Sequence, residues 1–237
     1  MTTLAFRPRR LRAVVDETRL SLRYRGLIAT ARRSLARVVA SRSLPGEALE
    51  FDRRYGVDTS GSVPLSEVET IGDNADAGVD YSGTHGPAFL QAIDSLEIDY
   101  RRFVFIDYGS GKGKALLLAS WYPFRRIAGV EFSPELHAIA DRNIDAFRSS
   151  KQRCHDIVSI CADATTFEAP GGHCVHYFFN PFGERVMRQV LANILAAHNE
   201  KRGEAYVVYF NPLLASMVED AGFRQIGRAG AHNVYRL

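Results

Sequence analysis

Apolar and polar positions follow two periodicities along most of the chain. Short apolar runs bounded by turn residues predict strands, and apolar residues spaced three or four apart predict helices. We expect strands at 103–108, 126–132, 157–161, 174–179, 205–210, 223–228 and 232–236. We expect helices at 87–98, 114–122, 184–198 and 213–220, and one that opens with Ser133-Pro134-Glu135. This alternation predicts the α/β class, with a parallel sheet covered by helices on both faces.

The first 50 residues carry a different pattern, that of a basic amphipathic helix. Its apolar face would consist of Leu20, Tyr24, Leu27, Ile28, Ala31, Leu35, Val38 and Val39. Arginines surround that stripe, and the helix is expected to end before Pro45. Three interpretations stay open: a helix packed on the body, a contact with an acidic partner or membrane surface, and an organelle transit peptide.

A poorly periodic segment separates this arm from the alternating region. Residues 51–86 are rich in Gly, Asp, Ser and Thr, so we expect a long loop there, followed by a helix. Loops of this length are uncommon unless they are functional or disordered. The sequence therefore predicts three parts: a helical arm at 1–50, a loop and helix leading in at 51–100, and an α/β body at 101–237.

Composition and charge narrow the function classes. The chain has 237 residues, of which 46% are hydrophobic and 24% charged, which excludes fibrous and wholly disordered classes. No apolar run approaches the length of a membrane-spanning helix. Residues 1–45 hold 11 Arg against two acidic residues, whereas the remainder holds 19 basic and 25 acidic residues. Any nucleic acid is therefore expected to bind with help from the arm.

The cysteines and histidines predict neither disulfides nor a metal centre. The three cysteines, Cys154, Cys161 and Cys174, are odd in number and form no CxxC pair, which is typical of reduced thiols in a cytoplasmic compartment. His173 and His176 lie close in sequence, but residues three apart on a strand point to opposite faces. We therefore expect no metal site there.

The strongest local signal is a glycine-rich loop, Asp107-Tyr108-Gly109-Ser110-Gly111-Lys112-Gly113, between an expected strand and helix. Ligands bind at this edge of an open α/β sheet. A phosphate-binding P-loop would need Ser or Thr after its lysine, but Ala115 follows Lys114. A dinucleotide loop would need its third glycine where Lys114 stands. The pattern that fits is D-x-G-x-G-x-G, and a turn without a ligand is disfavoured because alternating glycines cost backbone entropy.

This loop resembles the first motif of class I S-adenosylmethionine-dependent methyltransferases. The resemblance implies a three-layer α/β sandwich, with a seven-stranded, mostly parallel, Rossmann-like sheet whose last hairpin adds an antiparallel strand. It also implies S-adenosylmethionine as cofactor. The implied contacts are Asp107, Gly109, Ser110, Gly111 and Gly113 near the methionine part, Glu131 and Phe132 near the ribose, and Asp163 and Ala164 near the adenine. The family often uses an upstream segment as a cofactor lid, a role that Tyr81 and Thr84 would take here.

The end of the fourth strand carries the motif expected to face the transferred methyl group, Asn180-Pro181-Phe182. It is similar to the Asn/Asp-Pro-Pro-aromatic motif of amino-group methyltransferases, with one proline instead of two. It is also distantly similar to the Asn-containing motif of Dot-type histone-lysine methyltransferases, and the whole set looks most like bacterial stand-alone methyltransferases of unassigned substrate. The resemblance implies catalytic roles for Asn180, Pro181 and Phe182, with Asn180 also near the cofactor.

Three functions follow as hypotheses. The first is methyl transfer to nitrogen of a protein lysine or another amine. The second is methylation of an RNA or DNA base, which the arginine-rich arm favours and the acidic body disfavours. The third is a non-catalytic regulatory protein that binds S-adenosylmethionine. A second Asn-Pro pair, Asn211-Pro212, follows the fifth strand and is expected to be a plain strand-to-helix turn.

Overall fold

A computed structural model of the chain describes residues 46–47, 49–72 and 74–237. All of these belong to one compact unit. The basic amphipathic helix expected near residues 20–39 lies outside the described residues.

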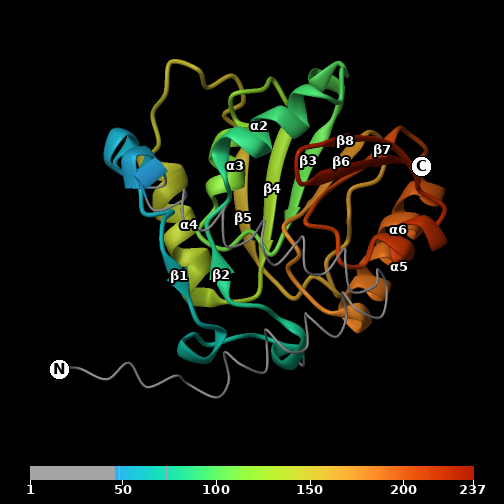
Figure 1. Cartoon of the computed structure of the whole chain (residues 1–237), viewed down its shortest axis with the longest axis horizontal. Helices are drawn as coiled ribbons and strands as arrows, with labels where there is room; N and C mark the ends of the chain where they lie inside the picture. The colour runs from blue at the N-terminus through green and yellow to red at the C-terminus, as the bar shows by residue number, and fades with distance from the viewer. Residues whose placement is uncertain (1–45, 48, 73) are drawn as a thin grey trace. The chain divides into compact units, whose positions relative to one another are not determined.

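The described residues form a seven-stranded sheet with the order β5-β4-β3-β6-β7-β9-β8 (Figure 1). Its strands are β3 (Val104–Tyr108), β4 (Arg126–Glu131), β5 (Ile157–Cys161), β6 (Cys174–Phe178), β7 (Ala205–Phe210), β8 (Arg224–Ala229) and β9 (His232–Arg236). The five strands β5, β4, β3, β6 and β7 are parallel to one another, and β9 runs antiparallel to both β7 and β8. The expected mostly parallel sheet with one reversed strand in the last hairpin is confirmed.

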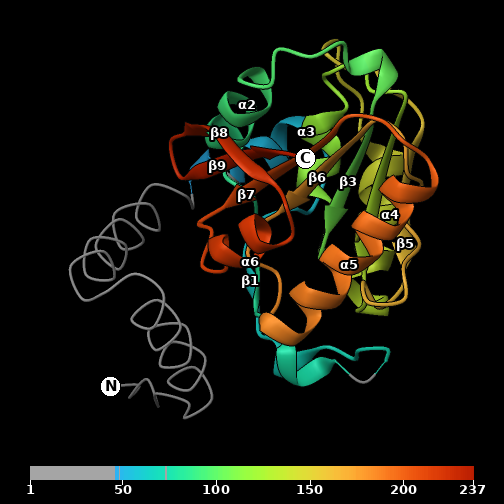
Figure 2. The same ribbon diagram turned by 90° about the vertical axis from the view of Figure 1, so that its right-hand side faces the viewer.

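Helices cover both faces of the sheet. They are α2 (Gly86–Asp94), α3 (Lys114–Ala119), α4 (Pro134–Ala146), α5 (Glu184–Glu200) and α6 (Ala215–Asp220). Connections between parallel strands are right-handed. The chain moves outward in one direction from β3 to β5 and in the other direction from β6 onward, so its helices lie on opposite faces of the sheet. Figure 2 shows α5 and α6 in front of the sheet, with α3 and α4 behind it. Within the part that is described, no helix is both long and apolar enough to cross a bilayer.

The central strands are hydrophobic throughout because both of their faces are covered. Every residue of β3 and of β6 is buried. Helix α4 begins as its sequence predicts: the Ser133 side chain accepts a hydrogen bond from the Leu136 N–H, and Pro134 occupies the first turn. Helix α2 ends at Asp94, four residues earlier than the predicted bound of 98.

The segment 51–86, expected as a long loop, contains short regular elements. The chain is helical at 49–55, and two short strands, β1 (Ser62–Val63) and β2 (Tyr81–Ser82), pair antiparallel. Two short 3-10 turns, η1 (Leu65–Glu67) and η2 (Ala75–Ala77), lie between them. A third, η3 (Tyr100–Arg102), precedes β3. These elements are too short to give a periodic signal, so they depend on contacts with the body.

We call residues 57–72 and 74–84 the strap. In Figure 1 its blue-green ribbon runs along the ends of the strands where the glycine loop also lies. The helix at 49–55 precedes it and packs aromatic rings on the body: the Phe51 and Phe147 ring centroids lie 6.1 Å apart, and those of Tyr55 and Trp121 lie 6.3 Å apart. The strap is thereby fixed to the body at its start.

Candidate functional site

The glycine loop connects β3 to α3 and needs its three alternating glycines. Gly109, Gly111 and Gly113 have φ angles of 75°, 53° and 83°, in the left-handed region that other residues adopt only with strain. The N–H groups of Gly109 and Ser110 both donate to the Val130 carbonyl, at 2.8 and 3.1 Å. The loop therefore turns sharply and stays attached to the end of β4.

Asp107, at the end region of β3, is a buried carboxyl with an unmatched atom. Only 3% of the residue is exposed, and its Oδ1 has no hydrogen-bond partner among the described residues. Burial, with a smaller effect from the charge of Glu131, raises the pKa of Asp107 well above its ordinary value. A cationic donor would relieve both the missing hydrogen bond and the uncompensated charge.

Glu131, the last residue of β4, holds the backbone around the loop. Its Oε2 accepts from the Gly111 N–H at 2.7 Å, and its Oε1 accepts from the Ser133 N–H at 2.9 Å. Burial raises the pKa of Glu131, and these backbone hydrogen bonds oppose that effect. The Phe132 N–H contributes a third backbone bond, so the carboxylate keeps an acceptor position for a neighbouring hydroxyl group.

Asp163 follows β5 and already has partners for both oxygens. Its Oδ2 accepts from Asn74 Nδ2 at 2.7 Å, and its Oδ1 accepts from the N–H and the hydroxyl of Thr165, each at 2.8 Å. Burial alone would raise the pKa of Asp163, but these hydrogen bonds and the charge of Arg185 together lower it. Its carboxylate is therefore stable without a ligand.

Asn180, Pro181 and Phe182 leave the end of β6 in a strained turn. Asn180 has a φ angle of 55°, which Asn tolerates better than most residues. Its side-chain Oδ1 accepts from the buried Tyr209 hydroxyl, on the adjacent strand β7, at 3.0 Å. Pro181 packs so closely on the glycine loop that a Cβ at position 109 would lie 2.6 Å from the proline Cβ. The turn after β6 and the loop after β3 thus form one surface.

A partly open pocket lies at this surface. It is lined by Asn74, Gly78, Gly109, Val130, Phe132, Ala162, Asp163, Ala164, Pro181, Phe182 and Val186. Its walls are mostly apolar with a few polar groups, which is the usual lining of a small-molecule site. The structure therefore brings the segments after β3, β4, β5 and β6 together around one cavity, as the topology of an open α/β sheet requires.

The strap lines part of the pocket through Asn74 and Gly78 and is bonded to the segments around it. The Ile71 N–H donates to the Phe132 carbonyl at 2.9 Å, and the Gly183 N–H donates to the Ala77 carbonyl at 2.9 Å. Gly78 forms an isolated antiparallel bridge with Phe182. The pocket is thus bounded by the strap as well as by the loops of the sheet.

Tyr81, at the other end of the strap, covers the glycine loop. A Cβ placed on Gly111 would lie only 2.3 Å from the Tyr81 ring, so Gly111 is needed for close approach as well as for its φ angle. Burial, with the nearby charges of Asp52 and Asp58, raises the pKa of Tyr81 well above its ordinary value. The side chain therefore remains a neutral phenol.

Sequence reasoning missed two groups of residues at this site. Asn74, which binds Asp163 and lines the pocket, lies in a segment without any recognisable motif. Lys112 was visible in the glycine loop, but its sequence position gave no indication that it contacts the strap. A charged residue inside a glycine-rich loop was the one available signal.

The remaining chemical candidates lie in ordinary surroundings. The ring of His176 makes a hydrogen bond at 3.1 Å to the buried Tyr108 hydroxyl, and burial lowers the pKa of His176 to about 3. Asn211 shares the left-handed conformation of Asn180, with a φ angle of 44°. Neither residue is among those that line the pocket, but Asn180 directly precedes Pro181 and Phe182, which do. All three cysteines are free thiols.

Comparisons with known proteins bear on the fold alone. No family model matches it, and no curated protein matches its sequence. A ribosomal protein L11 methylase from Lactobacillus delbrueckii subsp. bulgaricus is 14% identical, with a TM-score of 0.43 over 63% of this chain and 74% of that one. An RNA methyltransferase from Salinibacter ruber, solved with S-adenosyl-L-homocysteine, is 19% identical, with a TM-score of 0.42 over 65% and 90%.

A third similar structure is the mitomycin 7-O-methyltransferase MmcR, 13% identical with a TM-score of 0.46 over 63% of this chain. The aligned part spans 53% of MmcR, about half of its length. The names of these three proteins cover protein, RNA and small-molecule substrates. At such identities and TM-scores the likeness does not bear on the chemistry of this chain's site.

Proposed function

We propose that the chain is an S-adenosylmethionine-dependent methyltransferase that transfers the methyl group to nitrogen. One observation carries the proposal: a single pocket joins the glycine loop after β3, the acidic segment after β5 and the Asn-Pro-Phe turn after β6. Bound there, the cofactor would supply a methyl group already activated by the positive charge of its sulfonium.

The residues present fit this cofactor. The unpartnered Oδ1 of Asp107 suits an ammonium group, and Glu131 keeps an acceptor position for a ribose hydroxyl. The apolar walls formed by Val130, Phe132 and Ala164 suit a planar nucleobase. Asp163 is the weakest part of the fit, because Asn74 and Thr165 already use both of its oxygens.

Asn180 and Pro181 would orient an amine. The Tyr209 hydroxyl fixes the Asn180 amide and uses one acceptor position of Oδ1, which leaves a second. That oxygen and the Pro181 carbonyl would accept hydrogens from a neutral amine and direct its lone pair. Phe182, beside the pocket, would stabilise the cationic charge that develops on nitrogen. Alignment of this kind contributes several kcal/mol to methyl transfer without a strong general base.

The acceptor is proposed to be a lysine side chain or another amine of a protein. An RNA or DNA base is the alternative, because Phe182 would also stack on a planar base and the arginine-rich arm would bind phosphates. A non-catalytic S-adenosylmethionine-binding protein is the third outcome. The three free thiols fit a reducing, cytoplasmic location.

The test uses S-adenosylmethionine carrying a labelled methyl group and fractionated extract. We expect protease-sensitive, alkali-stable label, since N-methyl groups survive alkali and carboxyl methyl esters do not. Label in nuclease-sensitive material would support the base alternative. No transfer, with the cofactor bound, would leave the regulatory function.

The matched variants are Asn180→Gly and Asn211→Gly, which remove the same side chain from two left-handed positions without adding strain. Asn180→Gly should lower kcat about a hundredfold, the scale of one lost transition-state hydrogen-bond partner, and leave cofactor affinity within about threefold. Asn211→Gly should change neither. An unchanged kcat in Asn180→Gly would overturn the proposed role of Asn180.

A further inference from the structure

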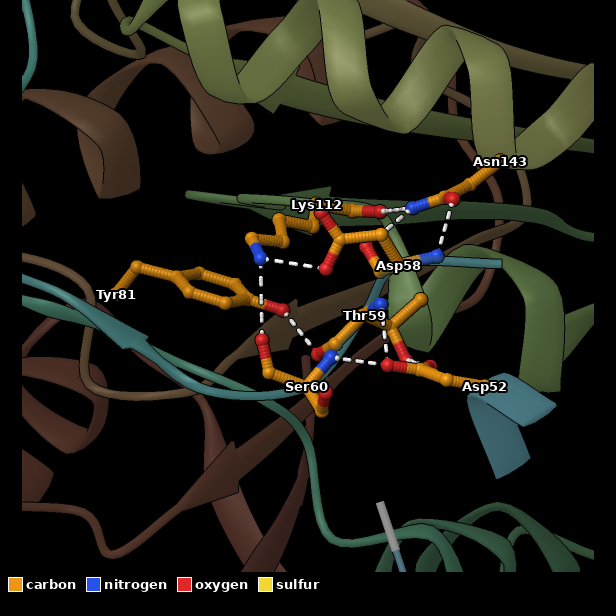
Figure 3. Close-up of polar contacts among 7 residues, drawn as sticks. All are labelled: Asp52, Asp58, Thr59, Ser60, Tyr81, Lys112 and Asn143. Carbon is orange, nitrogen blue, oxygen red and sulfur yellow. Dashed lines mark hydrogen bonds and ion pairs between the residues drawn. The ribbon is translucent and has the colours of Figure 1, made fainter. Parts of the chain in front are cut away.

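The lysine of the glycine loop contacts the strap through its charged end. The Lys112 Nζ donates to Asp58 Oδ1 at 2.7 Å and to the Ser60 carbonyl at 3.1 Å (Figure 3). It also lies 5.7 Å from the centroid of the Tyr81 ring. Because only 10% of the Lys112 side chain is exposed, whereas that of Asp58 is 62% exposed, the ammonium is enclosed more than its partner. The charged end of Lys112 therefore binds the strap.

The turn at 58–60 is built to receive this lysine. Asp52, from the helical segment 49–55, accepts from the N–H groups of Thr59 and Ser60, at 2.9 and 2.7 Å, and from the Thr59 hydroxyl at 2.5 Å. These bonds tie the turn to the helical segment 49–55 and are separate from its contacts with the glycine loop. The Ser60 carbonyl and the Asp58 carboxylate therefore reach Lys112 from a fixed backbone.

Asn143, on α4, links the turn to the glycine loop. Its Oδ1 accepts from the Asp58 N–H at 2.8 Å, and its Nδ2 donates to the carbonyls of Asp58 and Lys112, at 2.7 and 2.8 Å. Asn143 is 3% exposed, so these bonds replace its contacts with water. Figure 3 shows the amide between the two segments.

Tyr81 is the part of the strap that this arrangement holds in place. Its hydroxyl donates to the Thr59 carbonyl at 2.7 Å, so the ring is tied to the same turn that Lys112 binds. The ring lies against Gly111, whose N–H is bound by Glu131. The electrostatic influence of Asp107 also reaches Tyr81. The ring therefore covers the polar end of the site, away from the apolar walls of the pocket.

We propose that Lys112 is a positioning residue, which fixes Tyr81 through the turn at 58–60 as the roof over the polar end of the site. That end, with Asp107 and Glu131, is where the charged amino-acid part of S-adenosylmethionine would lie, because the apolar pocket suits the nucleobase. This inference rests on the proposed function. It assigns Lys112 to cofactor retention without direct contact between Lys112 and the cofactor.

The opposite role for Tyr81 is that of a plug, which fills the polar end and must leave before the cofactor enters. The two roles give opposite results when the ring is removed. Tyr81→Ala should weaken cofactor binding and speed release if the ring is a roof, and should tighten binding if the ring is a plug.

The experiment measures S-adenosylmethionine affinity by calorimetry and its release by stopped flow, on the full chain. Lys112→Met and Tyr81→Ala should each raise Kd about tenfold, mainly through faster release. The double variant should lose no more than the larger single effect, because Lys112 acts through Tyr81. Lys151→Met is the matched control, since Lys151 also faces an aromatic ring, that of Trp121 at 4.6 Å, and is exposed.

Additive losses in the double variant would overturn the inference, as would an unchanged release rate in Lys112→Met or tighter binding in Tyr81→Ala. If Lys112→Met fails to fold, Asp58→Asn breaks the same ion pair from the exposed partner and should also speed release.

Glu131→Ala separates the two proposals. If wild type binds and Glu131→Ala does not, normal binding by the Lys112 and Tyr81 variants would refute the roof alone. Wild type that binds no S-adenosylmethionine would refute both.

Discussion

Two aspartates near the ends of β3 and β5, on either side of β4 in the same sheet, are in opposite electrostatic states. Asp107 is buried, its Oδ1 has no partner among the described residues, and burial raises its pKa. Asp163 has partners for both oxygens, and its hydrogen bonds lower its pKa. Asp107 therefore lowers the stability of the folded chain in the absence of a ligand, whereas the charge of Asp163 is already compensated.

The difference shows which acid the site depends on. A buried, unmatched carboxyl is retained at a cost in stability that a bound cation would offset. A carboxylate satisfied by Asn74 and Thr165 mainly fixes the strap and the segment after β5. Although sequence position alone gives the two acids similar roles, the structure favours Asp107 as the group that a positively charged ligand completes.

The largest expected effect comes from Asp107→Asn. Removing the carboxylate should weaken S-adenosylmethionine binding by about 30-fold or more, the scale of a lost charged hydrogen bond. The melting temperature of the free protein should stay the same or rise, because a buried charge is removed. Calorimetric titration and thermal unfolding measure the two quantities.

Asp163→Asn is the control for that variant. It should change affinity much less and should lower the melting temperature, because it weakens compensated hydrogen bonds. Equal losses of affinity in the two variants would remove the distinction between the two acids.

The pH dependence of stability should have opposite sign for the two acids. A raised pKa in the folded state means that Asp107 stabilises the fold at pH values below its unfolded pKa, and that this contribution is lost as pH rises through the folded pKa. The lowered pKa of Asp163 means that its contribution is present above its unfolded pKa and is lost as pH falls.

Denaturant unfolding of wild type and both variants across the acid range measures these contributions. The free energy of unfolding of wild type minus that of Asp107→Asn should fall as pH rises. The same difference for Asp163→Asn should rise. Differences that change in the same direction with pH would contradict the opposite states assigned to the two acids.

The smallest expected effect comes from Asn74→Ala. It removes one of the partners of Asp163, so the free energy of unfolding should fall by about 1 kcal/mol. Cofactor affinity should change by less than about threefold, because Asn74 acts on the already compensated acid. Denaturant unfolding and calorimetry report the two values. A tenfold loss of affinity would instead place Asn74 among the ligand-binding groups.

The sheet and its central loop could be predicted from sequence because their signals are local. Buried parallel strands are continuous apolar runs, and the three glycines that must adopt positive φ are visible as a pattern. The capped start of α4 is equally local. The proposed site residues around the pocket follow the ends of these strands, so topology alone brings them together.

The strap could not be predicted, because its structure depends on distant partners. The turn at 58–60 is held by Asn143 and Lys112, more than 50 residues away, and Asn74 meets Asp163 across 89 positions. Two-residue strands carry no periodic signal. Nor does sequence show that Asp107 is left without a partner for Oδ1 and Asp163 is not, since that difference is set by packing.

The most direct test of the account is a calorimetric titration of the wild-type chain with S-adenosylmethionine, with NAD as the control ligand. The account predicts binding of S-adenosylmethionine in the micromolar range, none of NAD, and loss of binding in Glu131→Ala. Absence of S-adenosylmethionine binding, or equal binding of NAD, would contradict the claim that this pocket is a methyl-donor site.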